Sequence, residues 1–538
     1  MHENRIHDAC REKKEDTMKR TSKPGVAVTV TALILSGCAA VPGDLGRSDV
    51  DEMVAKRGQE AAAAVSAEAS AELLASLTAV PLTPESAIRI ALINNPHLAA
   101  TYATLGFGAA DVYQAGRIRN PVFSASVLNS SVPFEKDQIT FGLVASFTDL
   151  ITLSARKRLS AGAFSVLKQS IGNEVLRVAA DAEGNYFRYV GAQQVAALRA
   201  QTARAAGLSA SLAERYHHAG NLSKRELALE SAAASEARLL ALSAQADEFA
   251  ARTALATVLG LSVGDVWQAP AQLDLPLSGE ADLGTLLGRA HESRLDLAAA
   301  HARADILADR LGVVNWTRWL GELEVGVERE REKEGGYLTG PTASWELPIF
   351  NQHEDALLRA NADLQIAIFD VRRITMEVDN SVRLAHTALL NARARVQEYR
   401  GVLLPQRVEA VAQAQKEVSF MLIGVFELIS LKQDEYDAYQ GYLESIRDYW
   451  LRRVELSLAV GNALPGHEQT GQKPIDVEAL IRPTQPGMAH SGHGAMRDHS
   501  QMKGTEGTAG EAPDHSGRTM MNSDEPDPKT DKDSGGSQ

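Results

Sequence analysis

The feature that most constrains the fold of this 538-residue chain is a stretch from Pro133 to Pro270 with no internal proline. Most of it is Ala, Leu, Glu, Arg, Gln and Ser, a composition that favours helices. One break stands out, at His217-His218-Ala219-Gly220-Asn221, where a Gly-Asn pair suits a left-handed helix end and a tight reversal. The pattern predicts antiparallel helices over 153–216 and 223–260. At roughly 1.5 Å per residue the first would be about 96 Å long, far beyond a normal globular helix.

The sequence also contains a repeat of this unit. Three features of the first copy recur 201 residues later, namely Gly220 at Met421, Glu226-Leu227 at Glu427-Leu428 and Gly260 at Gly461. Asn95-Pro96-His97-Leu98 matches Arg294-Leu295-Asp296-Leu297 at an offset of 199. Such a period is too long for a solenoid and predicts an internal duplication over residues 84–464, with chance matching as the alternative. Pro405 is expected to interrupt the second long helix.

Strand-like segments separate the helical parts. They lie at 122–128, 138–147, 323–327 and 338–349, and each successive pair is typical of a hairpin. Pro341 weakens the assignment of the last strand at its own position. Upstream, Pro84-Glu85 is expected to open one amphipathic helix that runs to about Gly116. The predicted fold class is α+β, mostly α.

The N-terminus reads as an export signal. Residues 26–35 (VAVTVTALIL) form an apolar run of signal-peptide length, preceded by Lys19, Arg20 and Lys23. The following Leu35-Ser36-Gly37-Cys38 resembles a bacterial lipobox, which implies acylation of Cys38; an ordinary signal peptide with an incidental cysteine is the alternative. We expect a signal peptide over 1–37, with Met18 a better start than Met1. A lipid-anchored linker with some helix would then cover 38–80.

Composition and motifs exclude several function classes. The formal net charge is −14, so a basic face for nucleic acid is not expected. The two cysteines, Cys10 and Cys38, both lie near the N-terminus, which excludes a CxxC-type metal or redox site. Beyond residue 40 no apolar run reaches about 18 residues, the length of a transmembrane helix. Without a phosphate loop, a nucleophile elbow or an HExxH motif, an enzyme is not expected.

Five motifs carry a resemblance to a known family. They are ALINNPHLAATYA, SRLDLAAAHARAD, SWELPIFNQ, GVLLPQRVEAVAQAQKEV and DYWLRRVELSLAVGNALPG. In this order and spacing, residues 82–466 resemble the TolC-type outer-membrane efflux family, and many members of that family are lipoproteins. The resemblance divides the chain into a first repeat at 81–272 and a second at 273–466. A Met/His-rich tail, predicted to be disordered, follows at 467–538.

The resemblance implies an assembly and its partners. Four strands per chain cannot close a barrel, and open sheet edges do not persist in lipid. Three chains would supply 3 × 4 = 12 strands, a plausible barrel size, so a homotrimer in the outer membrane is expected. The long helices would continue as a tunnel through the periplasm. Family partners are a periplasmic adaptor, an inner-membrane RND-type pump and outer-membrane lipid, with no nucleic acid.

In this family the turns between the long helices form the periplasmic tip, which opens when an adaptor docks. Those turns map to 217–222 and 421–425, and the candidate tip residues are His217, His218, Gly220, Met421 and Gly424. The sequence departs from the usual pattern where Met421 stands in place of the first copy's Gly220. The apolar segment 421–426 (MLIGVF) suggests a docking or sealing surface, although local packing between helices explains it equally well.

Two glutamates follow the two turns. Trimerisation would place Glu226 or Glu427 in a ring of three carboxylates, and such rings attract cations. The alternative is that both are helix-start glutamates favoured by the helix dipole.

The tail carries a candidate metal-binding set. Residues 483–538 contain no Ile, Leu, Val, Phe, Trp or Tyr, so they cannot bury a core. Thioethers suit Cu(I), and imidazole suits copper, zinc and nickel. The candidate ligands are Met488, His490, His493, Met496, His499, Met502, His515, Met520 and Met521. Random composition of a disordered tail is the alternative.

Together these features predict a lipid-anchored outer-membrane channel of a tripartite efflux system for heavy-metal cations, with copper or silver favoured. Export of drugs or other small organic molecules by the same fold is the first alternative. A periplasmic coiled-coil scaffold or adaptor without a channel is the second. No resident cofactor is expected, although a transported or tail-bound metal cation fits the tail.

Overall fold

The computed structural model describes residues 43–58, 67–129, 131, 133–262 and 264–464. The chain divides into two units, Met1–Arg482 and Pro483–Gln538, and every described residue belongs to the first unit. The predicted signal peptide, Cys38 and the nine tail ligands lie outside the described residues.

The first repeat is helical except for one hairpin. Two short helices precede it, α2 (Arg47–Ala55) and α3 (Ala67–Thr78). The repeat itself consists of α4 (Pro84–Asn94), α5 (Pro96–Ala103), α6 (Leu105–Ala115), β1 (Val122–Leu128), β2 (Gln138–Ser146), α7 (Phe147–His218) and α8 (Lys224–Leu259). The strand β1 has the predicted bounds. The long helix α7 begins earlier than predicted, because the Ser146 hydroxyl accepts a hydrogen bond from the Asp149 amide at 3.3 Å and caps the helix.

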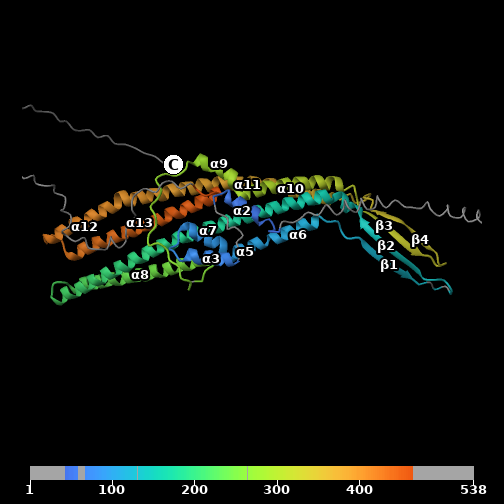
Figure 1. The fold of residues 1–538 in the computed structure, drawn as a ribbon. Helices are drawn as coiled ribbons and strands as arrows, with labels where there is room; N and C mark the ends of the chain where they lie inside the picture. The colour runs from blue at the N-terminus through green and yellow to red at the C-terminus, as the bar shows by residue number, and fades with distance from the viewer. Residues whose placement is uncertain (1–42, 59–66, 130, 132, 263, 465–538) are drawn as a thin grey trace, which may run out of the picture. The chain divides into compact units, whose positions relative to one another are not determined.

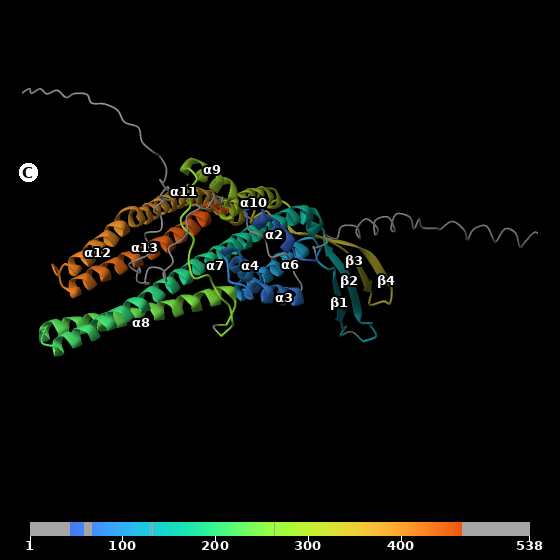
Figure 2. The ribbon, with the colours of Figure 1, turned by 60° about the vertical axis from the view of Figure 1, so that its left-hand side comes forward.

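The second repeat has the same order. It consists of α9 (Leu283–Ser293), α10 (Leu295–Thr317), β3 (Leu323–Arg331), β4 (Tyr337–Trp345), α11 (Glu354–Glu398), the π-helix η1 (Tyr399–Leu403), α12 (Leu404–Ser419) and α13 (Val425–Val460). The predicted interruption near Pro405 is confirmed, because η1 separates α11 from α12 immediately before this proline. Figures 1 and 2 show the hairpins α7–α8 and α12–α13 ending together, at the end of this unit opposite the sheet.

Equivalent contacts in the two copies support the predicted duplication. In the first copy, the Asn95 side-chain amide donates to the Val258 carbonyl at 2.8 Å, at the C-terminus of α8. In the second copy, the Arg294 guanidinium donates to the Ala459 carbonyl at 3.1 Å, at the C-terminus of α13. The last helices of the two copies, α8 and α13, both end at a glycine with a positive φ, of 68° and 71° respectively. In each copy, the short N-terminal helices are therefore joined to the C-terminal end of that copy's own last helix.

The single helix predicted over 84–116 is wrong. The chain forms three helices there, because Asn95 precedes a proline and takes an extended conformation with a ψ of 117°. The Asn95 side chain also accepts a hydrogen bond from the Leu98 amide at 3.1 Å, so it caps α5. A second break follows at Thr104, between α5 and α6.

The predicted linker contains a packed helix. In α2 the side chains of Val50 and Val54 are fully buried in the core, in contact with α7. Asp51 accepts a hydrogen bond from the Tyr102 hydroxyl at 2.9 Å, and Lys168 pairs with Asp49 at 2.6 Å. Residues 47–55 therefore belong to the folded body of this unit.

The two hairpins form one antiparallel sheet in the order β1-β2-β3-β4. The strands β2 and β3, which come from different repeats, lie at its centre, and Val144 pairs with Gly326. The strands β1 and β4 are the edges, which explains why β4 tolerates Pro341 opposite Val327. The strand β3 runs four residues past its predicted end, and β4 stops four residues before its predicted end.

A core of aliphatic and aromatic side chains holds the helical part together. Phe187 of α7 stacks on Trp450 of α13 with ring centroids 5.2 Å apart, and Tyr189 meets Trp267 edge-on at the same distance. Within the described ranges, no helix combines the length and apolar character that crossing a membrane requires.

Candidate functional site

The two helical turns have the same hydrogen-bond pattern. The amide of Gly220 donates to the His217 carbonyl, and the next amide donates to the Tyr216 carbonyl at 2.9 Å. In the second copy, Met421 donates to the Val418 carbonyl at 3.0 Å, and the next amide donates to the Glu417 carbonyl at 2.9 Å. Both are Schellman motifs, which place one residue in the left-handed region. The φ angles are 79° at Gly220 and 58° at Met421.

The second turn presents an apolar surface, which we call the apolar tip and define as Phe420, Met421 and Leu422. These three side chains are 77, 93 and 73% exposed. They do not pack between helices of this chain, unlike the neighbouring Phe426, whose ring meets that of Tyr216 edge-on at 6.1 Å. Of the predicted apolar segment 421–426, Met421 and Leu422 are therefore free in the single chain, whereas Phe426 packs against Tyr216 and links the two hairpins.

The predicted tip histidines lie in the last turn of α7. His217 Nδ1 is 2.8 Å from the Leu222 carbonyl oxygen, so this side chain holds the turn closed. His218 Nε2 lies 4.0 Å from the Glu214 carboxylate, and both side chains are exposed. Among the described residues, no group of three or more His, Cys, Asp or Glu side chains is arranged to hold a metal ion.

The two candidate ring glutamates have different surroundings. The Glu226 carboxylate accepts hydrogen bonds from the Ser223 amide at 3.0 Å and the Ser223 hydroxyl at 2.7 Å, and these hydrogen bonds lower its pKa. Ser223 and Glu226 form a capping box, so this carboxylate has a local structural role. Glu427 follows Gly424, which has no side chain to form such a box. The carboxylate-ring interpretation stays a prediction for both.

Two ion pairs that the sequence did not predict lie near the tip, one between the two hairpins and one within the hairpin α12–α13. Arg199 of α7 pairs with Asp437 of α13 at 2.8 Å, and Arg407 of α12 pairs with Asp434 of α13 at 2.9 Å. Arg199 and Asp437 are 238 residues apart, so no local pattern could have indicated the pair.

A buried carboxyl group, Glu280, and a half-buried one, Glu183, mark the middle of the helical part. The Tyr449 hydroxyl donates to the Glu280 carboxylate at 2.5 Å and accepts from the Leu277 amide at 3.1 Å. Glu183 lies at a small cavity with Leu458 and Asn462, and burial raises the pKa of Glu183 to about 7. The hydrogen bonds of Tyr449 hold the segment around 277–280 against α13.

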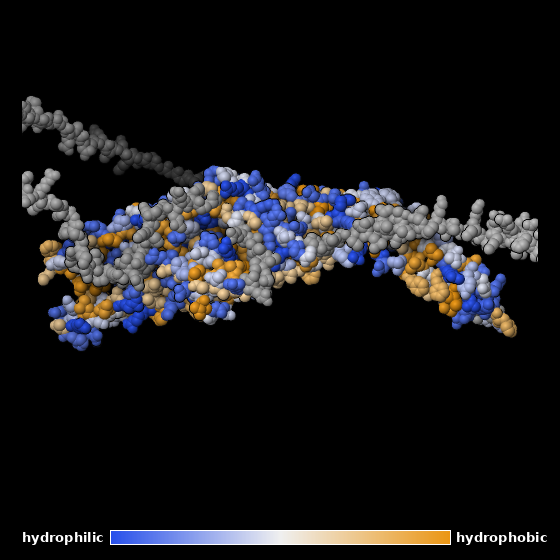
Figure 3. All heavy atoms as spheres, viewed as in Figure 1, coloured by the Kyte–Doolittle hydropathy of each residue, from blue (hydrophilic) through white to orange (hydrophobic). Residues whose placement is uncertain are grey.

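The sheet has two chemically different faces, because paired residues of neighbouring strands point to the same side. The apolar face includes the row Phe123, Leu143, Val327 and Pro341 and the stacked rings of Phe123 and Phe141. Figure 3 shows apolar residues gathered on part of the sheet. The polar face carries Ser124, Thr140, Thr342 and three glutamates, Glu324, Glu328 and Glu330. None of the sheet's described residues on this face is Lys or Arg.

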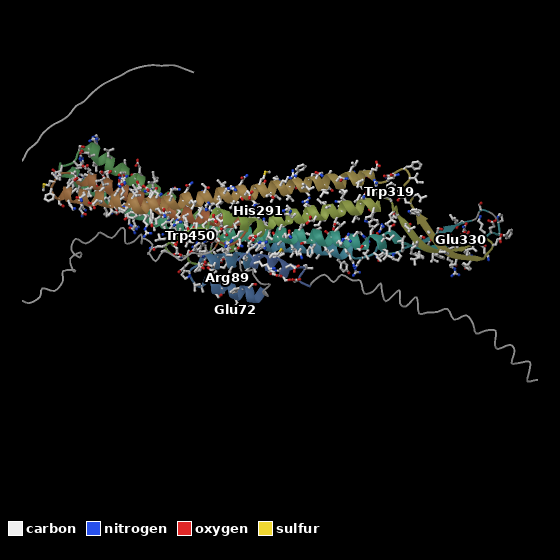
Figure 4. The ribbon with its side chains drawn as sticks, turned by 90° about the horizontal axis from the view of Figure 1, so that it is seen from above. Glu72, Arg89, His291, Trp319, Glu330 and Trp450 are labelled. Atoms are coloured by element: carbon white, nitrogen blue, oxygen red, sulfur yellow. The ribbon has the colours of Figure 1, made fainter. Side chains whose placement is uncertain are left out.

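Tryptophans lie where the helices meet the sheet. Trp319 and Trp345 are about half exposed, and the Trp345 indole donates to the Leu320 carbonyl at 2.8 Å. Figure 4 shows Trp319 at this junction and Glu330 farther along the sheet. Amphipathic aromatic rings of this kind favour a membrane–water interface.

A two-faced four-stranded sheet joined to two long helical hairpins is the fold of the TolC-type outer-membrane efflux channels. No family model matches the sequence, and no curated protein sequence matches it. Solved structures do match this fold.

The outer membrane protein VceC from Vibrio cholerae aligns with 71% of this chain and 96% of its own, at a TM-score of 0.59 and 16% identity. CusC, whose crystal structures describe conformational changes accompanying folding and transmembrane channel formation, aligns with 71% of this chain and 93% of its own, at a TM-score of 0.59 and 16% identity. The CmeC outer membrane channel of Campylobacter jejuni aligns with 74% and 88%, at a TM-score of 0.59 and 14% identity. At such identities the likeness is one of fold.

Proposed function

We propose that this chain is one protomer of a homotrimeric outer-membrane channel in a tripartite efflux system. The observation that carries the proposal is the sheet, with one apolar face, one polar face and the edge strands β1 and β4. Three such sheets would pair their edges into 12 strands (3 × 4), with the apolar face toward lipid and the polar face lining the lumen. The fold shared with the outer-membrane channels OprN and CmeC supports this assignment.

The helical hairpins suit the periplasmic part of such a channel. The helix α7 has 72 residues, which corresponds to about 108 Å. The hairpin ends lie away from the sheet, where a periplasmic adaptor and an inner-membrane RND-type pump would approach. The apolar tip offers exposed side chains for contact with the adaptor. Acylation of Cys38 would anchor the N-terminus to the same membrane.

The proposed cargo is a heavy-metal cation, with copper or silver favoured. The three glutamates on the polar face would give the lumen nine carboxylates in the trimer (3 × 3), and carboxylate-lined pores favour cations. The Met and His residues of the tail add ligands that suit soft metals.

Complementation of a deletion strain tests the cargo. The strain receives the full-length protein, a truncation after Arg482, or an empty vector, and growth is measured in copper, in silver and in a panel of drugs. We expect the full-length protein to restore metal tolerance. Rescue by the truncation as well would assign the tail an accessory role. A strain that changes only in drug tolerance would contradict the metal proposal and support export of organic molecules.

Conductance of the purified protein in planar bilayers tests the channel itself. A pore-forming trimer is the expected result. A trimer that forms no pore, together with an unaltered strain phenotype, would support the alternative of a periplasmic scaffold.

A further inference from the structure

Two arginines interrupt the apolar face of the sheet near the far end of β3. Arg329 pairs in register with Phe141 and Thr339, and Arg331 pairs with Ile139 and Tyr337. Both guanidinium groups therefore lie on the same side of the sheet as Phe123, Leu143 and Val327. The presence of two charged side chains on such an apolar face calls for an explanation.

These arginines have no acidic partner. Every Asp and Glu of the four strands, that is Glu324, Glu328 and Glu330, lies on the opposite face. Within the described part of the chain, neither Arg329 nor Arg331 forms an ion pair, and Arg329 instead lies over the Tyr337 ring at 4.6 Å. In the proposed trimer, β1 of the next protomer would add only Phe123, Ala125 and Val127 to this face, so it brings no carboxylate either.

The arginines border a hollow in the sheet surface. The hollow has a volume of about 260 Å³ and is lined by Ile139, Phe141, Arg329, Arg331 and Tyr337. One side of it therefore offers two guanidinium groups, and the other offers aliphatic and aromatic surface. An amphipathic ligand with an anionic head and an apolar tail matches this arrangement.

The depth of the arginines fits a lipid headgroup. From Leu323, which pairs with Trp345 near the helices, to Arg331 the strand rises by eight residues, or about 27 Å. Strands of an outer-membrane barrel are tilted by about 40°, so this length spans about 21 Å of an apolar band about 25 Å tall. Trp319 and Trp345 would therefore mark the periplasmic interface, while Arg331 and Tyr337 would lie near the outer one and Arg329 just below it. An arginine at the midplane costs about 2–4 kcal/mol, but near the interface it costs about 0–1 kcal/mol.

We infer that Arg329 and Arg331 bind the phosphate groups of an anionic lipid in the outer leaflet, with its acyl chains against Ile139 and Phe141. Guanidinium groups suit phosphate because they form two parallel charge-assisted hydrogen bonds. The inference rests on the proposed membrane-spanning function and adds a partner to it: a lipid whose headgroup carries phosphate esters. Three such sites would surround each trimer.

Lipid retention by the full-length trimer in detergent tests this inference. The probe is lipid A carrying two phosphates, and the comparison lipid is its phosphate-free form. After size exclusion, the lipid bound per trimer is measured by mass spectrometry. We expect Arg329→Gln combined with Arg331→Gln to weaken retention of the phosphorylated lipid by about tenfold or more. Arg331→Gln alone and Arg329→Lys should give smaller losses.

The control variant is Arg383→Gln, which removes the same charge from an exposed position on α11. It should retain lipid like the wild type. Equal retention by the double variant, or equal binding of the phosphate-free lipid, would overturn the inference. Displacement by millimolar inorganic phosphate would also overturn it and indicate a site for free phosphate. Conductance separates the two proposals, since a conducting wild type without lipid retention refutes only this inference.

Discussion

At the residue scale, the two turns show one backbone conformation occupied by two different side chains. Gly220 adopts a positive φ at no steric cost, whereas Met421 adopts it against a clash between its Cβ and the backbone. Crowding by neighbouring atoms does not explain why the first turn has a glycine, because a Cβ added at Gly220 would meet nothing within 4 Å. Backbone strain of this kind clusters at functional sites, which accords with the proposed contact between the apolar tip and an adaptor.

Exchanging residues at this position tests the strain. Met421→Gly should stabilise the protein by about 1 kcal/mol, and Gly220→Ala should destabilise it by a similar amount. Thermal unfolding measures both effects. Gly340→Ala is the control, because Gly340 is not among the residues with a positive φ and nothing lies within 4 Å of it. If Met421→Gly lowered the unfolding temperature, the side chain would be contributing packing in the assembly that exceeds the strain.

A second residue-scale prediction concerns Glu183, which lies near Arg453 and Glu85. Burial raises the folded-state pKa from 4.5 to about 7, so this group contributes stability below pH 4.5 that is lost as the pH rises to 7. Glu183→Gln should therefore stabilise the protein at pH 8 by about 2 kcal/mol, allowing for partial exposure, with little change at pH 4.

Unfolding temperatures across this pH range measure the effect. The exposed Glu236→Gln on α8 serves as the control and should show no such trend. A stability difference that does not change between pH 4 and pH 8 would contradict the role of Glu183 ionisation.

At the element scale, the sequence predicted elements whose signals are local. The helix α8 was predicted to within one residue, because Ser223 and Gly260 define its ends. The sequence predicted some helix in the linker but not the packing of α2, because only Val50 and Val54 are buried and their burial depends on α7, which is distant in the chain. The tip turns were predicted from Gly220 and the repeat. The pair Arg199–Asp437 depends on how two distant hairpins meet, which no local pattern contains.

The junction between α10 and β3 gives an element-scale prediction. Gly321 has a φ of 63°, and a Cβ there would lie 2.0 Å from the Glu346 carbonyl oxygen. Gly321→Ala should therefore separate this junction from the end of β4 and cost more than about 2 kcal/mol. The yield of folded protein and its unfolding temperature measure the loss. Gly340→Ala in β4 is the control, since nothing lies within 4 Å of that position; an equal loss there would refute the steric argument.

At the scale of the whole molecule, the proposed trimer would contain three copies of each sheet and of the charged side chains on it. The polar face of one sheet carries Glu324, Glu328 and Glu330, and the trimer would bring nine carboxylates to one lumen. Their combined field would attract cations more than any single sheet does.

Selectivity measurements test that field. Glu328→Gln combined with Glu330→Gln should lower the ratio of cation to anion permeability, measured as the reversal potential across a KCl gradient in planar bilayers. The effect should shrink near 1 M salt, where the Debye length is about 3 Å. Glu334→Gln, in the turn after β3, is the control. Unchanged selectivity in the double variant would show that these carboxylates do not line the conducting path.

The edge strands β1 and β4 have a further consequence for how the protein behaves in the cell. In the proposed membrane-spanning barrel, the hydrogen-bonding groups of the two edge strands would be satisfied only by neighbouring protomers. In the proposed trimer, the population of complete channels would therefore follow mass action and rise with about the third power of the protomer concentration at low occupancy. Halving expression would then lower the number of channels by about eightfold, so modest changes in synthesis would act as a steep control on efflux capacity.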